Sequence, residues 1–81
     1  MAVYPNPAND VARIDYKLIK KSDVNINIYD LQGRLVKNIK LQSQKAGRQN
    51  FNIEVGELAK GTYILSICTS YDKASSKFLK Q

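Results

Sequence analysis

The stretch VNINIYDLQGRLV, residues 24–36, contains a strand, a turn and a return strand in one continuous run. Its first half alternates apolar with polar or amphipathic residues, the apolar ones being Val24, Ile26 and Ile28. This period of two is typical of a strand with one buried face. Asp30 suits the first position of a type I turn, and Gly33 can take the left-handed conformation that closes a three-residue loop with a bulge. We therefore predict a β-hairpin here, with Gly33 at positive φ.

The register of this hairpin follows from its loop. With residues 31–33 as the loop, Ile28 is expected opposite Val36 on the core face, and Tyr29 opposite Leu35 on the other face. The hairpin tip is then apolar on both faces. Tyr29, Leu35 and the turn residue Leu31 form either a recognition patch or a set of cross-strand contacts that only stiffen the hairpin.

The same alternation recurs along the rest of the chain. It predicts strands near residues 12–18, 36–41, 49–55, 63–69 and 74–80, with a bend or change of face after Asn38. Residues 19–23 are predicted as a polar turn, and residues 43–49 as a loop around Gly47. Six or seven short antiparallel strands, with turns about every 8 to 12 residues, predict an all-β, immunoglobulin-like β-sandwich. We place the sandwich at residues 11–81, after an extended lead-in at residues 1–10 that the prolines stiffen.

Two further patterns refine this sandwich. The spacing of Leu58, Gly61 and Tyr63 resembles a tyrosine corner, so we expect the Tyr63 hydroxyl to bond to backbone just upstream, between residues 55 and 60. Leu58 is expected to plug the edge of the sandwich in a tight crossover. In the last strand, Phe78 is expected in the core and Leu79 at the surface.

Composition limits the chemistry of the chain. Its 81 residues include one cysteine and no histidine, so neither an intramolecular disulfide nor a zinc-ligand cluster is expected. Cys68 is assigned to packing. The commonest general base is missing, and no serine or cysteine has an evident activating partner. We expect no enzyme activity, no metal and no cofactor.

Thirteen basic and seven acidic residues give a net charge of +6, which favours anionic partners. The lysines are scattered at alternate and turn positions, as on the solvated face of a sheet, and no nucleic-acid motif accompanies them. No apolar run of about 18 residues is present, so a soluble domain without a transmembrane segment is expected. The chain shows no secretory signal and begins abruptly at Met1, and we expect a domain taken from a longer precursor.

Three motifs follow one another along the chain: VYPNPAND at residues 3–10, IYDLQGRLVK at residues 28–37, and GTYIL followed by KASSKFLK within residues 61–80. Together they resemble the C-terminal sorting domain of the type IX secretion system, over nearly the whole chain. The resemblance implies an immunoglobulin-like sandwich that directs an N-terminal passenger through an outer-membrane translocon of a Gram-negative bacterium. It also implies a signal and not a catalyst.

The resemblance implies partners and locations as well. The partners are the translocon with its shuttle components, and a sortase-like cysteine peptidase that usually removes the domain and joins the passenger to anionic lipopolysaccharide. The domain would pass through the periplasm, and the passenger would reach the outer-membrane surface or the extracellular space. Cleavage would fall in a linker upstream of the sandwich, although some members keep the domain uncleaved.

Carried over by motif, the positions that match the family are Pro5, Asn6, Pro7, Asp30, Gly33, Arg34, Gly61 and Tyr63. Proline and glycine directly favour the backbone conformations of turns. We therefore expect a role in determining the fold for Pro5, Gly33, Gly61 and Tyr63. The terminal element that the family uses for export corresponds to Lys77, Phe78, Leu79 and Lys80. An edge strand there could offer unpaired backbone groups and charge to a receptor, unless Phe78 merely fills the core.

The candidate recognition residues are therefore Tyr29, Leu31, Leu35, Lys77, Phe78, Leu79 and Lys80. A different class of function also fits a sandwich of this size. A generic immunoglobulin-like accessory module could bind carbohydrate or protein, or stabilise a neighbouring enzyme domain, and it would not need the terminal element.

Overall fold

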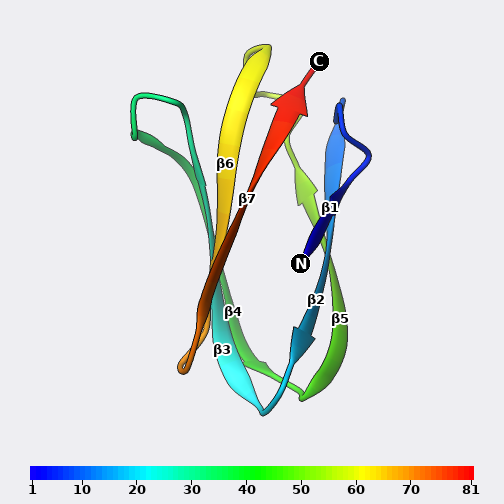
Figure 1. The fold of residues 1–81 in the computed structure, drawn as a ribbon, viewed down its shortest axis with the longest axis vertical. Helices are drawn as coiled ribbons and strands as arrows, with labels where there is room; N and C mark the ends of the chain where they lie inside the picture. Colours follow the sequence, from blue (N-terminus) through cyan, green and yellow to red (C-terminus); the bar gives the residue numbers. More distant parts are fainter.

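Seven β-strands make up all the regular structure in the computed structural model, which describes residues 1–81 (Figure 1). They are β1 (Ala2–Tyr4), β2 (Val11–Leu18), β3 (Ser22–Tyr29), β4 (Leu35–Gln44), β5 (Gly47–Glu54), β6 (Gly61–Cys68) and β7 (Lys73–Lys80). No helix is present that could cross a membrane.

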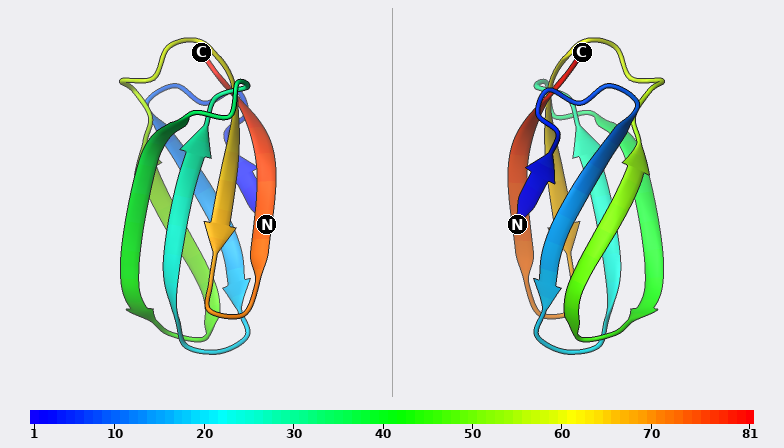
Figure 2. Two further views of the ribbon diagram at one scale, coloured as in Figure 1. Left: turned by 90° about the vertical axis from the view of Figure 1, so that its left-hand side faces the viewer. Right: turned by 90° about the vertical axis from the view of Figure 1, so that its right-hand side faces the viewer.

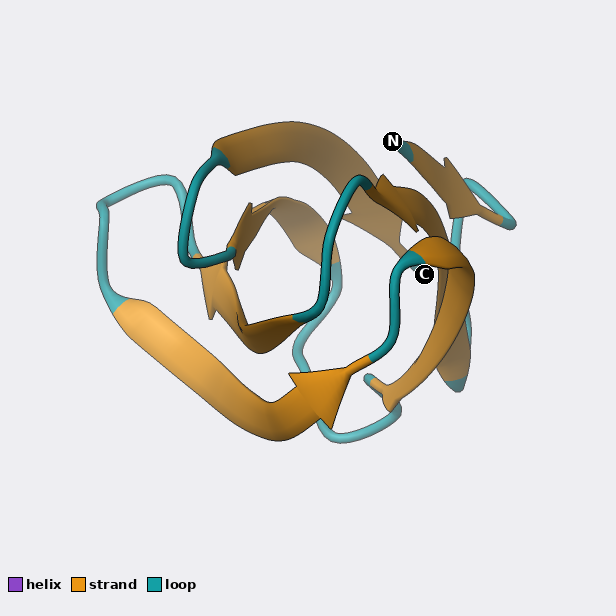
Figure 3. Cartoon of the chain, turned by 90° about the horizontal axis from the view of Figure 1, so that it is seen from below, coloured by secondary structure: helices purple, strands orange, loops and turns teal.

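The strands form two antiparallel sheets that face each other, one with strand order β1-β2-β5 and the other with strand order β4-β3-β6-β7. Figure 2 shows the four-stranded sheet from its outer side on the left and the three-stranded sheet on the right. Seen from below in Figure 3, strands and loops surround the space that the inward side chains fill. The predicted immunoglobulin-like β-sandwich is confirmed.

Inward side chains of both sheets form one core of 14 buried residues. Successive side chains of a strand point to opposite faces, and the core residues of β2, β3, β5 and β6 follow this alternation. β7 contributes Phe78, while Val3 of β1 and Ile39 and Leu41 of β4 are partly buried against the core. The fully buried large side chains are Phe78, Ile14, Leu18, Ile26, Ile28, Ile53, Leu65, Ile67, Val24 and Val55. The alternation at Val24, Ile26 and Ile28 therefore identified the core face of β3 correctly, and Phe78 lies in the core as predicted.

The central hairpin forms where it was predicted, but one pair in its register is different. Tyr29 lies opposite Leu35 as expected, whereas Ile28 pairs with Lys37 and not with Val36. The register shifts between these two pairs, so Val36 is the extra residue of a β-bulge. The prediction that Val36 faces the core is wrong, because the bulge turns it outward and leaves it 39% exposed.

The return strand also differs from the prediction beyond the bulge. We find no change of face after Asn38, because Lys37, Ile39 and Leu41 alternate on the inward side of β4. β4 runs on to Gln44 and β5 already begins at Gly47, so the connection between the sheets is much shorter than the predicted loop at residues 43–49. The polar turn after β2 is likewise shorter, since β3 begins at Ser22.

The first residues of the chain belong to the three-stranded sheet. Ala2–Tyr4 pairs antiparallel with residues 13–15 of β2 as a short edge strand. The lead-in is thus extended and also paired with the sheet. The division of the chain at residue 10 stays a prediction.

Candidate recognition surface

The loop of the central hairpin is held together by Asp30. Its backbone N–H donates to the Arg34 carbonyl at 3.0 Å, and its own carbonyl accepts from the Gly33 N–H at 3.1 Å. Its carboxylate accepts from the backbone N–H groups of Gln32 and Arg34, and from the Arg34 guanidinium at 2.8 Å. These bonds favour the charged form of the carboxylate and lower the pKa of Asp30 below its ordinary value. The largest cause is the bond from the backbone N–H of Arg34, and the bond from the Arg34 side chain adds to it.

Gly33 has φ +85° at the end of this loop, which confirms the predicted positive φ. A side chain at this position would be strained, because L-residues other than glycine rarely adopt that conformation. Asp30, Gly33 and Arg34 therefore build the loop itself. The loop projects at one end of the sandwich and carries Leu31, which is 65% exposed, at its tip.

The predicted tyrosine corner is present in the crossover after β5. The Tyr63 hydroxyl donates to the Ala59 carbonyl at 2.7 Å, within the predicted range of residues 55–60. Gly61 has φ +152° just before it, and Leu58 packs against the core from the sandwich edge. These three residues connect the crossover to the start of β6.

The four residues of the terminal element point in two directions. Phe78 and Lys80 face inward and are buried, and the Lys80 ammonium donates to the Gln81 carbonyl at 2.7 Å. Lys77 is exposed and Leu79 is 43% exposed on the outer face of β7. Only Lys77 and Leu79 are therefore accessible to a partner at that face.

The sheet register brings the hairpin tip and the terminal strand together. Leu35 lies opposite Tyr29, Tyr29 opposite Ile64, and Ile64 opposite Lys77, which makes one continuous row across all four strands. Leu79 lies diagonally next to Ile64 on the same face. We call Tyr29, Leu35, Ile64, Lys77 and Leu79 the recognition surface.

Ile64 is the member of this surface that the sequence-based choice of site residues missed. The signal for it was present, since Ile64 falls on the outward side of the alternating strand at residues 63–69. Ile64 lies on the outer face of a central strand, and it is half-buried there. Here it lies between Tyr29 on one neighbouring strand and Lys77 on the other, so that it connects the hairpin tip to the terminal element within one row of the sheet.

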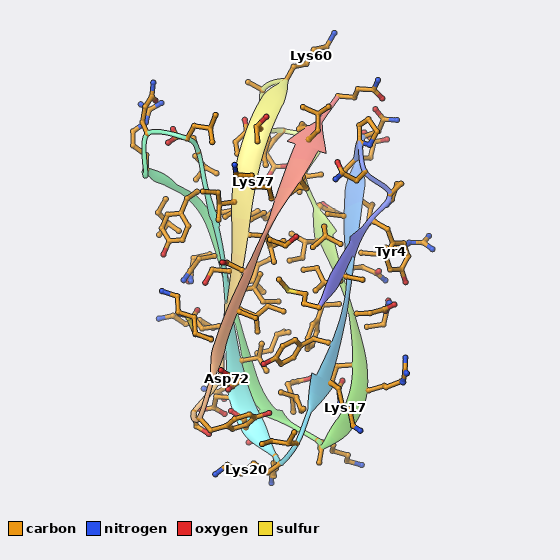
Figure 4. All side chains as sticks on the ribbon, in the orientation of Figure 1. Tyr4, Lys17, Lys20, Lys60, Asp72 and Lys77 are labelled. Atoms are coloured by element: carbon orange, nitrogen blue, oxygen red, sulfur yellow. The ribbon has the colours of Figure 1, made fainter.

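Charge and shape also characterise this surface. The ion pairs of the chain are Arg34 with Asp30 and Lys37 with Glu57, so Lys77 has no acidic partner. Figure 4 shows Lys77 on the side of the four-stranded sheet and Tyr4 projecting from the opposite sheet. Three surface hollows of about 420 to 470 Å³ exist, and none is lined by a residue of the recognition surface. Small ligands generally need concave sites, so this open surface suits a protein partner better.

The N-terminal PNP motif lies beside the terminal element. The Asn6 side-chain oxygen accepts from the Leu79 N–H at 2.9 Å, and the Ala8 N–H donates to the Leu79 carbonyl at 2.8 Å. Pro5 and Pro7 flank Asn6 and are exposed. The expectation of unpaired backbone groups at the end of β7 is therefore wrong at Leu79, because a segment distant in sequence occupies that edge.

Reactive groups do not gather at this surface. Cys68 is a free, half-buried thiol whose polar contact is the Ser66 hydroxyl, 3.8 Å from the sulfur. A hydroxyl is not a base that could activate a thiol. No group of three or more His, Cys, Asp or Glu residues is placed to hold a metal ion. The arrangement offers contacts for binding.

Comparison with known proteins gives one match. The family model described as the secretion system C-terminal sorting domain matches residues 2–81. No curated protein and no solved structure matches the chain.

Proposed function

The chain belongs to the family of C-terminal sorting domains of the type IX secretion system, and from this we propose that it is recognised as a folded surface by the translocon. Membership of the family means that the domain is a secretion signal carried on a passenger precursor. Export therefore leads to the cell surface or the extracellular space.

The proposed route has three steps. The precursor crosses the periplasm, shuttle components and the translocon bind the sorting domain, and the passenger passes the outer membrane. A sortase-like cysteine peptidase then removes the domain and joins the passenger to anionic lipopolysaccharide. The domain itself performs no chemistry in this route and acts as a binding element.

One observation supports the proposal that the translocon binds the folded surface. The row from Leu35 through Tyr29 and Ile64 to Lys77 exists only when β3, β4, β6 and β7 are paired. Apolar side chains beside an unpaired lysine suit a protein face that is apolar with an acidic rim, since such contacts combine burial with charge complementarity. An unfolded chain would present these residues separately.

The test uses a passenger fused to the domain. Replacing Lys77 and Leu79 by glutamine removes charge and apolar area from the surface while Phe78 and Lys80 keep their buried positions. We expect the variant domain to keep its melting temperature, because substitutions at exposed positions change stability little. The fused passenger should accumulate in the periplasm. Ile64→Thr, which keeps a β-branched residue in the strand, should reduce export in the same direction.

A matched control removes the same kinds of side chain elsewhere. Ile19 is 72% exposed and Lys21 is also exposed, both in the turn between β2 and β3. This turn lies at the end of the sandwich marked by Lys20 in Figure 4, opposite to Lys60. Ile19→Gln with Lys21→Gln should leave surface delivery unchanged. Normal delivery of the Lys77 and Leu79 variant would contradict the recognition surface.

A further inference from the structure

Residues 6–8 lie along the outer edge of β7, on the side away from β6. Three hydrogen bonds join the two segments: Leu79 N–H to the Asn6 side chain at 2.9 Å, Ala8 N–H to the Leu79 carbonyl at 2.8 Å, and Gln81 N–H to the Ala8 carbonyl at 2.9 Å. Ala8 and Lys80 thereby form a parallel bridge. Both backbone polar groups of Leu79 are used by this contact.

Residues 5–8 are anchored to the core, and their prolines do not favour pairing with a further strand. The Ala8 side chain is completely buried in the core, whereas Pro5, Asn6 and Pro7 are exposed. Proline has no N–H to offer to another strand, which is a common way of protecting a sheet edge. The bond from Asn6 comes from its side chain, so it can be removed without altering the backbone of the segment.

A receptor could bind the end of β7 in two ways. It could add a strand to the edge, which requires free N–H and C=O groups, or it could contact side chains on the outer face. The contact with residues 6–8 blocks the first way at Leu79 and holds the Leu79 side chain on the face that also carries Lys77 and Ile64.

We infer that the sorting receptor recognises the terminal element through the side chains of Lys77 and Leu79 and not by strand addition, and that Asn6 is the positioning residue for this contact. The inference rests on the proposed function, because it assumes that the terminal element is read. It assigns the N-terminal PNP motif a direct connection to the C-terminal end of the signal.

The Asn6→Ala variant separates the two ways of reading. It removes the acceptor of the Leu79 N–H, so amide hydrogen exchange at Leu79 in the isolated domain should rise roughly two- to tenfold, as for the loss of one hydrogen bond. If the receptor binds the side chains of Lys77 and Leu79, export of a fused passenger should fall, because Leu79 is held less firmly. If the receptor instead pairs with the edge of β7, freeing the Leu79 N–H should leave export unchanged or increase it.

Two further variants make the result specific. Asn6→Asp keeps an acceptor oxygen at the same place and should restore both slow exchange at Leu79 and export. Asn9→Ala removes a nearby exposed asparagine that makes no side-chain hydrogen bond, and it should behave like the wild type. Exchange of the core amides of β3 and β6 should stay equal in all variants, which would exclude general unfolding.

The outcomes distinguish the inference from the function on which it rests. If the wild-type domain fails to deliver a passenger, the proposed function is wrong and the inference falls with it. If the wild type delivers and Asn6→Ala delivers equally or better, only the inference is overturned. Unchanged exchange at Leu79 in Asn6→Ala would overturn it independently of any receptor.

Discussion

The rings of Tyr63 and Phe78 stack against each other, with centroids 5.7 Å apart and planes inclined by 24°. The two residues are direct partners across β6 and β7. Tyr63 also donates its hydroxyl to Ala59 in the crossover before β6. One side chain therefore joins the crossover to the strand that carries the terminal element, and the packing of Phe78 supports the exposed positions on either side of it.

We expect Tyr63→Phe to reduce the free energy of unfolding by about 1 kcal/mol, the usual net value of one hydrogen bond. The stacking on Phe78 should survive, because the ring is retained. Urea denaturation measures the difference. Tyr29→Phe is the control, since the Tyr29 hydroxyl has no hydrogen-bond partner in the structure and its loss should cost little. Equal stability of Tyr63→Phe and the wild type would argue against the corner.

Gly33→Val should destabilise the domain by about 1 to 2 kcal/mol, because a β-branched residue is forced into left-handed space at φ +85°. Gly33→Asn should cost clearly less, since asparagine tolerates this conformation better than other side chains. Thermal or urea unfolding of the two variants provides the comparison. Similar losses for valine and asparagine would mean that backbone conformation is not the cause.

The pKa of the Asp30 carboxyl should be lower in the folded domain than its ordinary value of 3.8. A lowered pKa stabilises the fold above the ordinary value, and this contribution is lost as the pH falls through the lowered pKa. An NMR titration of the Asp30 carboxyl and of the Gln32 and Arg34 amides measures both effects. Because the Arg34 backbone N–H is the largest single cause and the Gln32 N–H also contributes, the Asp30 pKa should stay below its ordinary value in Arg34→Gln. A return of the pKa to its ordinary value in that variant would show that the guanidinium dominates.

Thermal unfolding of the isolated domain should not depend on a chelator or a reducing agent. Cys68 is the single cysteine, and the core is formed by apolar side chains of both sheets. Melting curves with and without EDTA, and with and without a thiol reductant, test this. A large drop in melting temperature with either reagent would show a stabilising metal or covalent link.

If a peptidase removes the domain as proposed, cleavage should fall before Ala2. Residues 2–4 are paired with β2, and residues 8 and 10 make further backbone hydrogen bonds to Leu79 and Val55. A protease needs an extended, accessible backbone, which paired segments do not provide. The mass of the released domain gives the cleavage point. A fragment that begins within residues 3–10 would contradict this expectation.

Local patterns in the sequence were enough for the core, the hairpin and the tyrosine corner. Alternation at Val24, Ile26 and Ile28 predicted a buried face because the period of a strand is a property of the backbone. Gly33 and Tyr63 were predictable for a similar reason, since turn conformation and short-range hydrogen bonds involve residues close in sequence. The error at Val36 arose because a bulge adds one residue to one strand, and alternation alone does not show where it occurs.

The sequence by itself determined which segments become strands and which side chains point inward, because backbone sterics and the burial of apolar groups act locally along the chain. Only the tertiary structure decided which strands became neighbours. Ile64 joins Tyr29 to Lys77, and Asn6 binds Leu79 across 73 residues of sequence. No local pattern encodes such pairs, because they result from how two sheets pack and which edges remain to be covered. The proposed recognition surface and its N-terminal support are therefore properties of the folded domain.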